Sequence, residues 1–189
     1  MDPPDRRSHA PKPVKFNIPG HAHELTFSCF KRMPLLRSRL ANEFLADAIN
    51  AARMVHNFEV WAYVFMPDHV HLMIYPISET YSIAGILKAI KQSASRRVIN
   101  DWREQRPHLL AHLETGLKRP RYRFWQDGTG YDRNYYSPEQ IVKRIDYIHN
   151  NPVKRGLVEN PTEWKWSSAA FWIENGYTPV VIKRDHFPM

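Results

Sequence analysis

Two histidines stand two residues apart in a segment of alternating side chains. His69 and His71 flank Val70, and Leu72 and Ile74 continue the apolar set. Because successive side chains of a β-strand point to opposite faces, both imidazoles leave one face, with Cα atoms about 7 Å apart. We expect this to be the open face, where one small metal ion fits between the rings. The alternative is a pair of surface histidines in a chain that holds 10.

A tyrosine and an asparagine could complete such a site. Tyr147 and Asn151 are four residues apart in a segment that Ser137 and Pro138 open as a helix, so they lie on neighbouring turns of one helical face. The predicted buried stripe of this helix consists of Ile141, Ile145 and Ile148. Tyr147 lies away from the centre of that stripe. The alternative is an interfacial tyrosine whose hydroxyl group has an ordinary hydrogen-bond partner.

These residue types suit nucleophilic attack on a phosphodiester. A phenol ordinarily has a pKa of about 10 and is a poor nucleophile at neutral pH. Its attack therefore needs fixed geometry and a cation on the phosphate oxygens and the leaving group. Two histidines and an amide oxygen would leave coordination positions open for both oxygens.

The elements that must position these residues predict an α+β fold. Hydrophobic patterns indicate strands at 23–30, 58–66, 69–75 and 124–134, and helices at 35–56, 83–102 and 138–150. The order β-α-β-β-α-β predicts a ferredoxin-like antiparallel sheet, with an additional C-terminal helix carrying Tyr147. Strand 58–66 is apolar on both faces. Strict alternation places Phe58, Val60, Ala62 and Val64 on one face, and Trp61, Tyr63 and Phe65 on the other.

The composition favours a polyanionic partner. The chain has 27 Lys and Arg residues against 19 Asp and Glu, for a net charge of +8. No apolar run approaches the roughly 20 residues of a membrane span, and no signal segment opens the chain, so we expect a cytoplasmic protein. The single cysteine, Cys29, excludes an internal disulfide and a thiolate-cluster metal site.

The 189 residues fit one domain. We expect a flexible, basic, proline-rich arm at 1–19, a main domain at 20–170 with an insertion at 103–121, and an extension at 171–189. We interpret Trp125 and Tyr131 as core residues rather than as residues that stack on unpaired bases. Basic residues that could contact DNA phosphates are Arg6, Arg7, Lys88, Lys91, Arg96, Arg97, Lys118, Arg119, Arg121, Lys154 and Arg155.

Three segments together resemble the signature of a known family. They are YVFMPDHVHLM at 63–73, FWQ at 124–126 and DYIHNNPVKRGLV at 146–158. In this order they are similar to the signature blocks of the REP-associated tyrosine transposases, a branch of the single-tyrosine HUH transposases. The resemblance runs from about Pro19 to Ser168. Asp68 departs from it, because many relatives have Asn or Glu at that position.

The resemblance implies a specific chemistry. His69, His71 and Asn151 would bind Mg²⁺ or Mn²⁺, and Tyr147 would attack single-stranded DNA to give a 5′-phosphotyrosine and a free 3′-hydroxyl. The substrate would be a palindromic repeat folded into a hairpin. The resemblance implies a bacterial enzyme that is nucleoid-associated when bound to DNA, and we expect a monomer.

Three alternatives remain open at this stage. One is a hairpin-DNA-binding regulator with a silent site. Another is an RNA-binding domain, although the aromatic pattern of the RRM is absent. The third is a hydrolytic nuclease that uses the same metal, which would form no covalent adduct with DNA.

Overall fold

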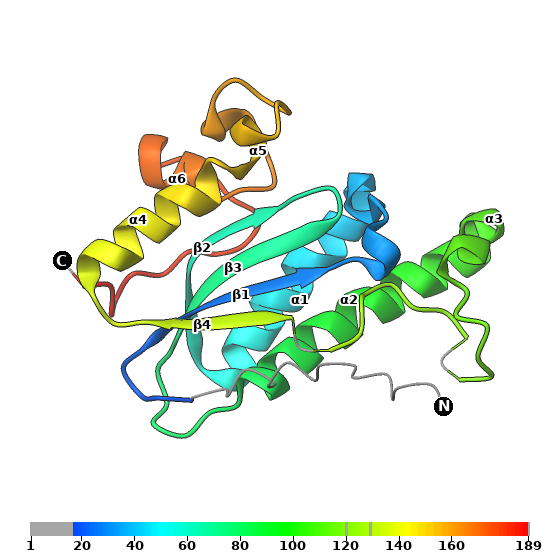
Figure 1. The fold of residues 1–189 in the computed structure, drawn as a ribbon, viewed down its shortest axis with the longest axis horizontal. Helices are drawn as coiled ribbons and strands as arrows, with labels where there is room; N and C mark the ends of the chain where they lie inside the picture. The colour runs from blue at the N-terminus through cyan, green and yellow to red at the C-terminus, as the bar shows by residue number, and fades with distance from the viewer. Residues whose placement is uncertain (1–16, 120, 129, 189) are drawn as a thin grey trace, which may run out of the picture.

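The computed structural model describes residues 17–119, 121–128 and 130–188, so Arg6, Arg7 and most of the predicted arm lie outside it. Its four strands form one antiparallel sheet in the order β2-β3-β1-β4 (Figure 1). The strands are β1 (Ala22–Ser28), β2 (Phe58–Phe65), β3 (His69–Pro76) and β4 (Tyr131–Tyr135). The helices are α1 (Arg39–His56), α2 (Ile83–Gln105), α3 (Pro107–Leu110), α4 (Pro138–His149), α5 (Asn151–Lys154) and α6 (Ala169–Glu174). This confirms the predicted ferredoxin-like fold with an added helix, α4.

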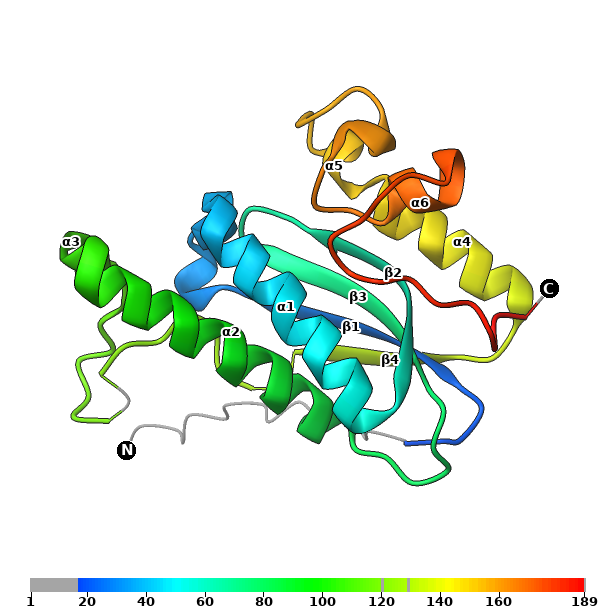
Figure 2. The ribbon, with the colours of Figure 1, turned by 180° about the vertical axis from the view of Figure 1, so that it is seen from behind.

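The two faces of the sheet have different covers. Helices α1 and α2 lie side by side over one face, as Figure 2 shows, and this face belongs to the larger apolar cluster, which includes Leu25 and Leu72. Helix α4 covers the other face with its buried stripe of isoleucines, as predicted. The sheet is therefore the middle of three layers, and α4 can bring side chains onto β3.

Strand β2 does not keep strict alternation. The register with β3 shifts between Val60 and Ala62. As a result Tyr63 and Phe65 pack with Val60 under α1 and α2, whereas Trp61 and Ala62 pack under α4. The predicted division of this strand was wrong, because a β-bulge inserts one residue and turns the following side chains over.

The last strand is shorter than the predicted 124–134. Phe124 and Trp125 turn into the core, where Trp125 forms an isolated bridge with Cys29. The chain then passes through Gly128 and Gly130, which have φ of +86° and +72°, before β4 starts. Position 130 requires glycine, because a Cβ atom there would lie 2.1 Å from the carbonyl oxygen of Thr26. Positive φ angles and this close approach explain why no continuous strand forms.

Helix boundaries differ from prediction in two places. Helix α1 begins at Arg39 because Ser38 Oγ caps it, accepting from Ala41 N at 3.3 Å, and residues 35–37 form a separate 3-10 turn. Helix α2 continues to Gln105, into the predicted insertion. The rest of that insertion forms α3, another 3-10 turn and a loop closed by a bridge between Glu114 and Tyr122.

The C-terminal segment packs along the edge of β2. Val180 and Ile182 are buried, and Lys183 N donates to Val60 O at 3.2 Å. Phe187 meets the Trp61 ring edge to face. None of the described helices has the length and apolar character needed to span a bilayer.

Candidate active site

Strand β3 carries His69 and His71 on the face of the sheet that α4 covers. The two residues are only 6% and 7% exposed, so the expectation of an open face was wrong: α4 and its apolar stripe exclude most solvent. The Nε2 atoms lie 3.2 Å apart, and the rings meet edge to face. The strand therefore points two potential ligand nitrogens at one place.

An oxygen holds the other nitrogen of each ring. His69 Nδ1 lies 2.8 Å from Asp68 Oδ1. His71 Nδ1 lies 3.0 Å from Thr26 Oγ1 and 3.4 Å from Glu24 Oε1. A ring that donates its Nδ1–H to a carboxylate presents the lone pair of Nε2 outward. At 3.2 Å the two Nε2 atoms can share a proton in a hydrogen bond, or, when both protons lie on the Nδ1 atoms, present two lone pairs to one cation.

This donor set fits a small divalent ion. Two ligand atoms that form a right angle at the ion, each roughly 2.1 Å from it, are about 3.0 Å apart. This is close to the 3.2 Å between the two Nε2 atoms. Burial lowers the pKa of His69 despite the neighbouring Asp68, which favours the neutral imidazole that binds metals. Within the described ranges, no three His, Cys, Asp or Glu side chains form a group that could hold a metal ion.

Asn151 is the predicted third ligand, and it is buried at the start of α5. Its Nδ2 donates to the carbonyl oxygens of Tyr147 at 2.8 Å and Ile148 at 3.3 Å. These bonds fix the amide against the end of α4 and leave Oδ1 as the atom suited to a cation. They link Asn151 to the tyrosine's backbone rather than to the histidines.

Tyr147 is half-buried on α4 and contacts the histidine pair. Its ring lies edge to face with His71, with centroids 6.0 Å apart. Two cations flank the same ring: Arg144 Cζ is 3.9 Å and Lys154 Nζ is 4.3 Å from its centroid. Cation–π contacts of this kind fix the ring and place positive charge beside it. The structure thus brings together the tyrosine, one histidine and two basic side chains.

A buried carboxylate joins these elements. Glu24 on β1 is fully buried and accepts two hydrogen bonds from Arg144, with Nη2 2.6 Å from Oε1. Tyr135 donates to Glu24 Oε2 at 3.2 Å. Burial by itself raises the pKa of Glu24, but hydrogen bonds from His71 and Arg144 outweigh it, so the net pKa is lowered. Glu24 is therefore a charged link between His71 and the arginine that contacts Tyr147.

Asp68 connects the other histidine to basic side chains. Its carboxylate accepts from Arg155 Nη1 at 3.2 Å and lies 3.6 Å from Arg32 Nη1. Burial raises the pKa of Asp68, while the hydrogen bond from His69 and the nearby Arg155 lower it below its usual value overall. Of the predicted DNA contacts, Lys154 and Arg155 therefore lie at the histidine–tyrosine site.

The other described basic candidates lie elsewhere. Arg97 pairs with Asp47 and covers the Phe44 ring, on the helical layer opposite α4. Arg121 pairs with Glu114. Four further basic residues are exposed, either on α2 or in the 114–122 loop: Lys88, Arg96, Lys118 and Arg119. Lys91 turns inward, and its Nζ donates to the carbonyl oxygens of Gln126 and Gly128.

Sequence analysis did not single out Glu24, Thr26 or Arg144. Glu24 and Thr26 alternate with the apolar Leu25 and Phe27 on β1, so an acidic residue within a strand was the available signal. Arg144 precedes Tyr147 by three residues, which places it on the adjacent turn of the helix.

Comparisons with known proteins found similarities in sequence and in fold. The sequence model of the family described as "Transposase IS200 like" matches residues 19–151. The REP-associated tyrosine transposase of Escherichia coli (strain K12) is 27% identical over 139 residues, which are 73% of this chain and 70% of that protein. A Haemophilus influenzae protein assigned to the same group is 27% identical over 132 residues, 66% of this chain and 70% of its own. A solved structure of a REP-associated tyrosine transposase bound to a REP hairpin has the same fold, with a TM-score of 0.68, 20% identity and 92% coverage of each chain.

Proposed function

Because this chain belongs to the IS200-like transposase family, we propose that it cleaves and rejoins single-stranded DNA at palindromic repeats that fold into hairpins. Tyr147 is the proposed nucleophile. The observation that carries the proposal is the contact between the Tyr147 ring on α4 and His71 on β3. The relative that was solved with a REP hairpin supports hairpin DNA as the substrate class.

In the proposed step, the phenol oxygen of Tyr147 attacks the phosphorus of one phosphodiester. The new P–O bond forms as the bond to the 3′ oxygen breaks, the phenol loses its proton, and the leaving oxygen gains one. The products are a 5′-phosphotyrosine and a free 3′-hydroxyl. Since a phosphoester is retained, a 3′-hydroxyl can later reverse the step and rejoin a strand without ATP.

The site's own residues have separate parts in this proposal. Arg144 holds the Tyr147 ring in place, and Glu24 holds Arg144. Lys154 and Arg155 bind phosphates near the scissile bond in this proposal. Asp68 and Glu24 orient the two imidazoles. We propose a monomer as the active unit.

We further propose that His69, His71 and the amide oxygen of Asn151 hold Mg²⁺ or Mn²⁺. When bound, such an ion would supply positive charge that offsets the charge on the phosphate oxygens. The facing Nε2 atoms and their oriented Nδ1 partners support this assignment.

A covalent-adduct assay tests the function. The protein is incubated with Mn²⁺ and a labelled oligonucleotide that carries a repeat hairpin from the neighbourhood of its gene, and the products are separated on a denaturing gel. We expect a protein–DNA adduct with the wild type and with Tyr177→Phe, a control at a tyrosine that is 90% exposed. Tyr147→Phe should form none.

Two other outcomes contradict the proposal. Hairpin binding without an adduct under any metal would favour a silent DNA-binding regulator. Cleavage without an adduct would favour a hydrolytic nuclease.

A further inference from the structure

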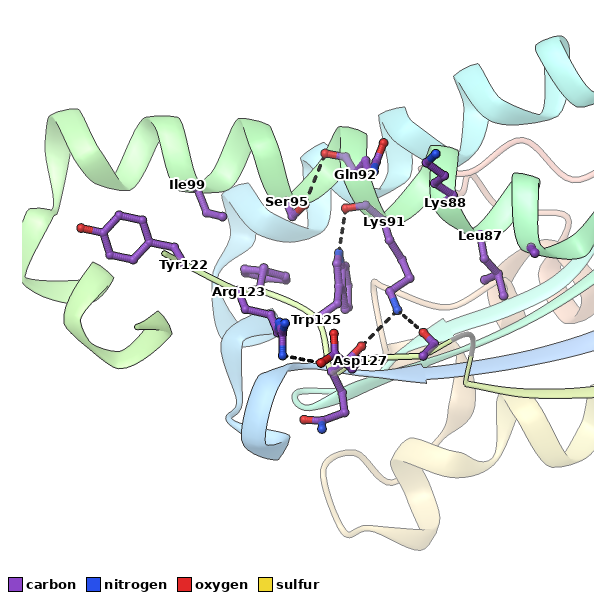
Figure 3. Close-up of a pocket in the computed structure, with 14 residues that line it drawn as sticks. Leu87, Lys88, Lys91, Gln92, Ser95, Ile99, Tyr122, Arg123, Trp125 and Asp127 are labelled. Carbon is purple, nitrogen blue, oxygen red and sulfur yellow. Dashed lines mark hydrogen bonds and ion pairs between the residues drawn. The ribbon is translucent and has the colours of Figure 1, made fainter. Parts of the chain in front are cut away.

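A second region of the molecule has the chemistry of a nucleic-acid site. A cavity of about 320 Å³ lies between α2 and residues 122–128 (Figure 3). Lys88, Lys91 and Arg123 line it together with Tyr122 and Trp125. Asp127 is the acidic residue of this lining, and Arg123 pairs with it. The cavity is therefore basic and partly aromatic.

The wall of this cavity is held in place by hydrogen bonds. Lys91 Nζ donates to Gln126 O at 3.2 Å and to Gly128 O at 2.9 Å. Trp125 Nε1 donates to Lys91 O at 3.0 Å. Figure 3 shows Lys91 reaching down from α2 beside the Trp125 ring, with Tyr122 towards one end. A cation and an aromatic ring fixed in this way lose little conformational freedom when a ligand binds.

Two further hollows continue the cavity in both directions. One, lined by Arg103 and Arg121, shares Ile99 and Tyr122 with it. The other shares Lys91, Gln126 and Asp127 with it and is lined by Thr26 and Arg32 as well. The shared residues make the three hollows neighbours on the surface, and we call the three together the α2 groove.

The α2 groove ends beside the histidine pair. Thr26, in its last hollow, contacts His71 Nδ1 at 3.0 Å. Arg32, in the same hollow, lies 3.6 Å from Asp68, whose other oxygen contacts His69. Through these contacts, one end of the α2 groove adjoins the residues that hold the histidine pair.

We infer that the α2 groove binds the unpaired DNA strand that leaves the cleavage site. Basic side chains along a groove follow a phosphate backbone, and exposed rings stack on unpaired bases. Six Lys and Arg side chains line the three hollows: Arg32, Lys88, Lys91, Arg103, Arg121 and Arg123. The half-exposed Tyr122, at a junction of two hollows, is the stacking residue. This inference rests on the proposed function for the identity of the strand.

Photocrosslinking with a defined probe locates the strand. The probe is a thymidine 12-mer with one 5-iodouracil, irradiated with the full-length wild-type protein, and the crosslinked peptides are mapped by mass spectrometry. We expect crosslinks at Tyr122. Crosslinks confined to peptides outside the groove would overturn the inference.

Affinity measurements give a second test. Fluorescence anisotropy with a labelled thymidine 12-mer should show binding at least fivefold weaker for Tyr122→Ala, since a stacked base contributes about 1–3 kcal/mol. Lys88→Ala and Arg103→Ala, at exposed helical positions, should each weaken binding about threefold. Each should also make the dependence of affinity on salt concentration shallower. Lys183→Ala removes an exposed lysine beside β2, at the opposite edge of the sheet, and should change the affinity less than twofold.

The outcomes separate this inference from the proposed chemistry. Wild-type affinity in all three groove variants, or a uridine 12-mer that displaces the DNA at lower concentration, would overturn the groove as a DNA site. Groove crosslinks without a Tyr147 adduct would contradict the chemistry alone. An adduct without groove crosslinks would contradict the groove alone.

Discussion

The two faces of the sheet divide stability from chemistry. His71 and Leu72 are neighbours on β3, yet Leu72 is fully buried in the apolar cluster under α1 and α2, whereas His71 contacts Thr26, Glu24 and Tyr147 under α4. On the first face the β1 residues Leu25 and Phe27 are also apolar. The same face also holds His23, which is fully buried and whose ring nitrogens lie 2.8 Å from Asp132 Oδ1 and from the Tyr81 hydroxyl group.

The contrast has a physical reason. A fully apolar face stabilises the fold through burial and close packing. Buried polar groups add little net stability, because the free-energy cost of removing them from water offsets most of the free energy gained from their hydrogen bonds. A cluster of such groups on one face is therefore better explained by a site than by folding.

The largest expected effect compares two neighbouring residues. His71→Ala should reduce DNA cleavage at least about 10³-fold, roughly 4 kcal/mol in the barrier, and lower the free energy of unfolding by about 1–2 kcal/mol, because it removes a hydrogen-bond partner of the buried Glu24. Leu72→Ala should cost about 2–5 kcal/mol of stability, because it leaves a cavity in the core. Cleavage rates and urea denaturation of both variants measure this. An equal loss of stability in the two variants would break the comparison.

The second prediction concerns the Glu24–Arg144 pair. Arg144→Ala should lower the free energy of unfolding by about 3 kcal/mol, because it leaves a buried carboxylate without its cation. Adding Glu24→Gln to that variant should recover part of the loss. Arg39→Ala breaks an exposed pair with Glu43 and should cost less than about 1 kcal/mol. A similar small effect for Arg144→Ala would mean that the buried pair is not needed for folding.

The third prediction is a pH dependence of stability. Burial lowers the pKa of His149 from 6.5 to about 4. As the pH falls, His149 therefore takes up a proton in the unfolded chain before it does so in the folded protein. The stability that the neutral, buried His149 contributes is complete above about pH 6.5 and disappears towards pH 4. The loss reaches about 3 kcal/mol.

Chemical denaturation between pH 7.5 and 4.5 measures this slope. His149→Gln should make the slope shallower, with the remainder arising in part from His69, whose pKa is also lowered. The exposed residue His112 provides the control: His112→Gln should leave the slope unchanged. An unchanged slope in His149→Gln would contradict the prediction.

The smallest expected effect is the response to metal. Mn²⁺ at tenfold its Kd should stabilise the protein by about 1.4 kcal/mol, which raises Tm by about 4 °C for a domain of this size. EDTA should reverse the shift, and His69→Ala should abolish it. Thermal denaturation followed by circular dichroism gives this readout without DNA. A shift that persists in His69→Ala would place the bound ion elsewhere.

Sequence by itself determined the local arrangement of the site. Alternation on β3 placed His69 and His71 on one face, and Ser137-Pro138 marked the start of the helix that carries Tyr147. The three motif segments gave the family, which the family comparison confirmed. These features depend on residues close together in the chain, whose relative directions are fixed by backbone geometry.

Only the tertiary structure decided how these pieces meet. Glu24 and Arg144 are 120 residues apart, and their pairing depends on how α4 packs across β2 and β3. The bulge in β2 and the three neighbouring hollows of the α2 groove likewise arise from contacts between distant segments. Local periodicity carries no information about such contacts, because it specifies which face a side chain takes and not what packs against that face.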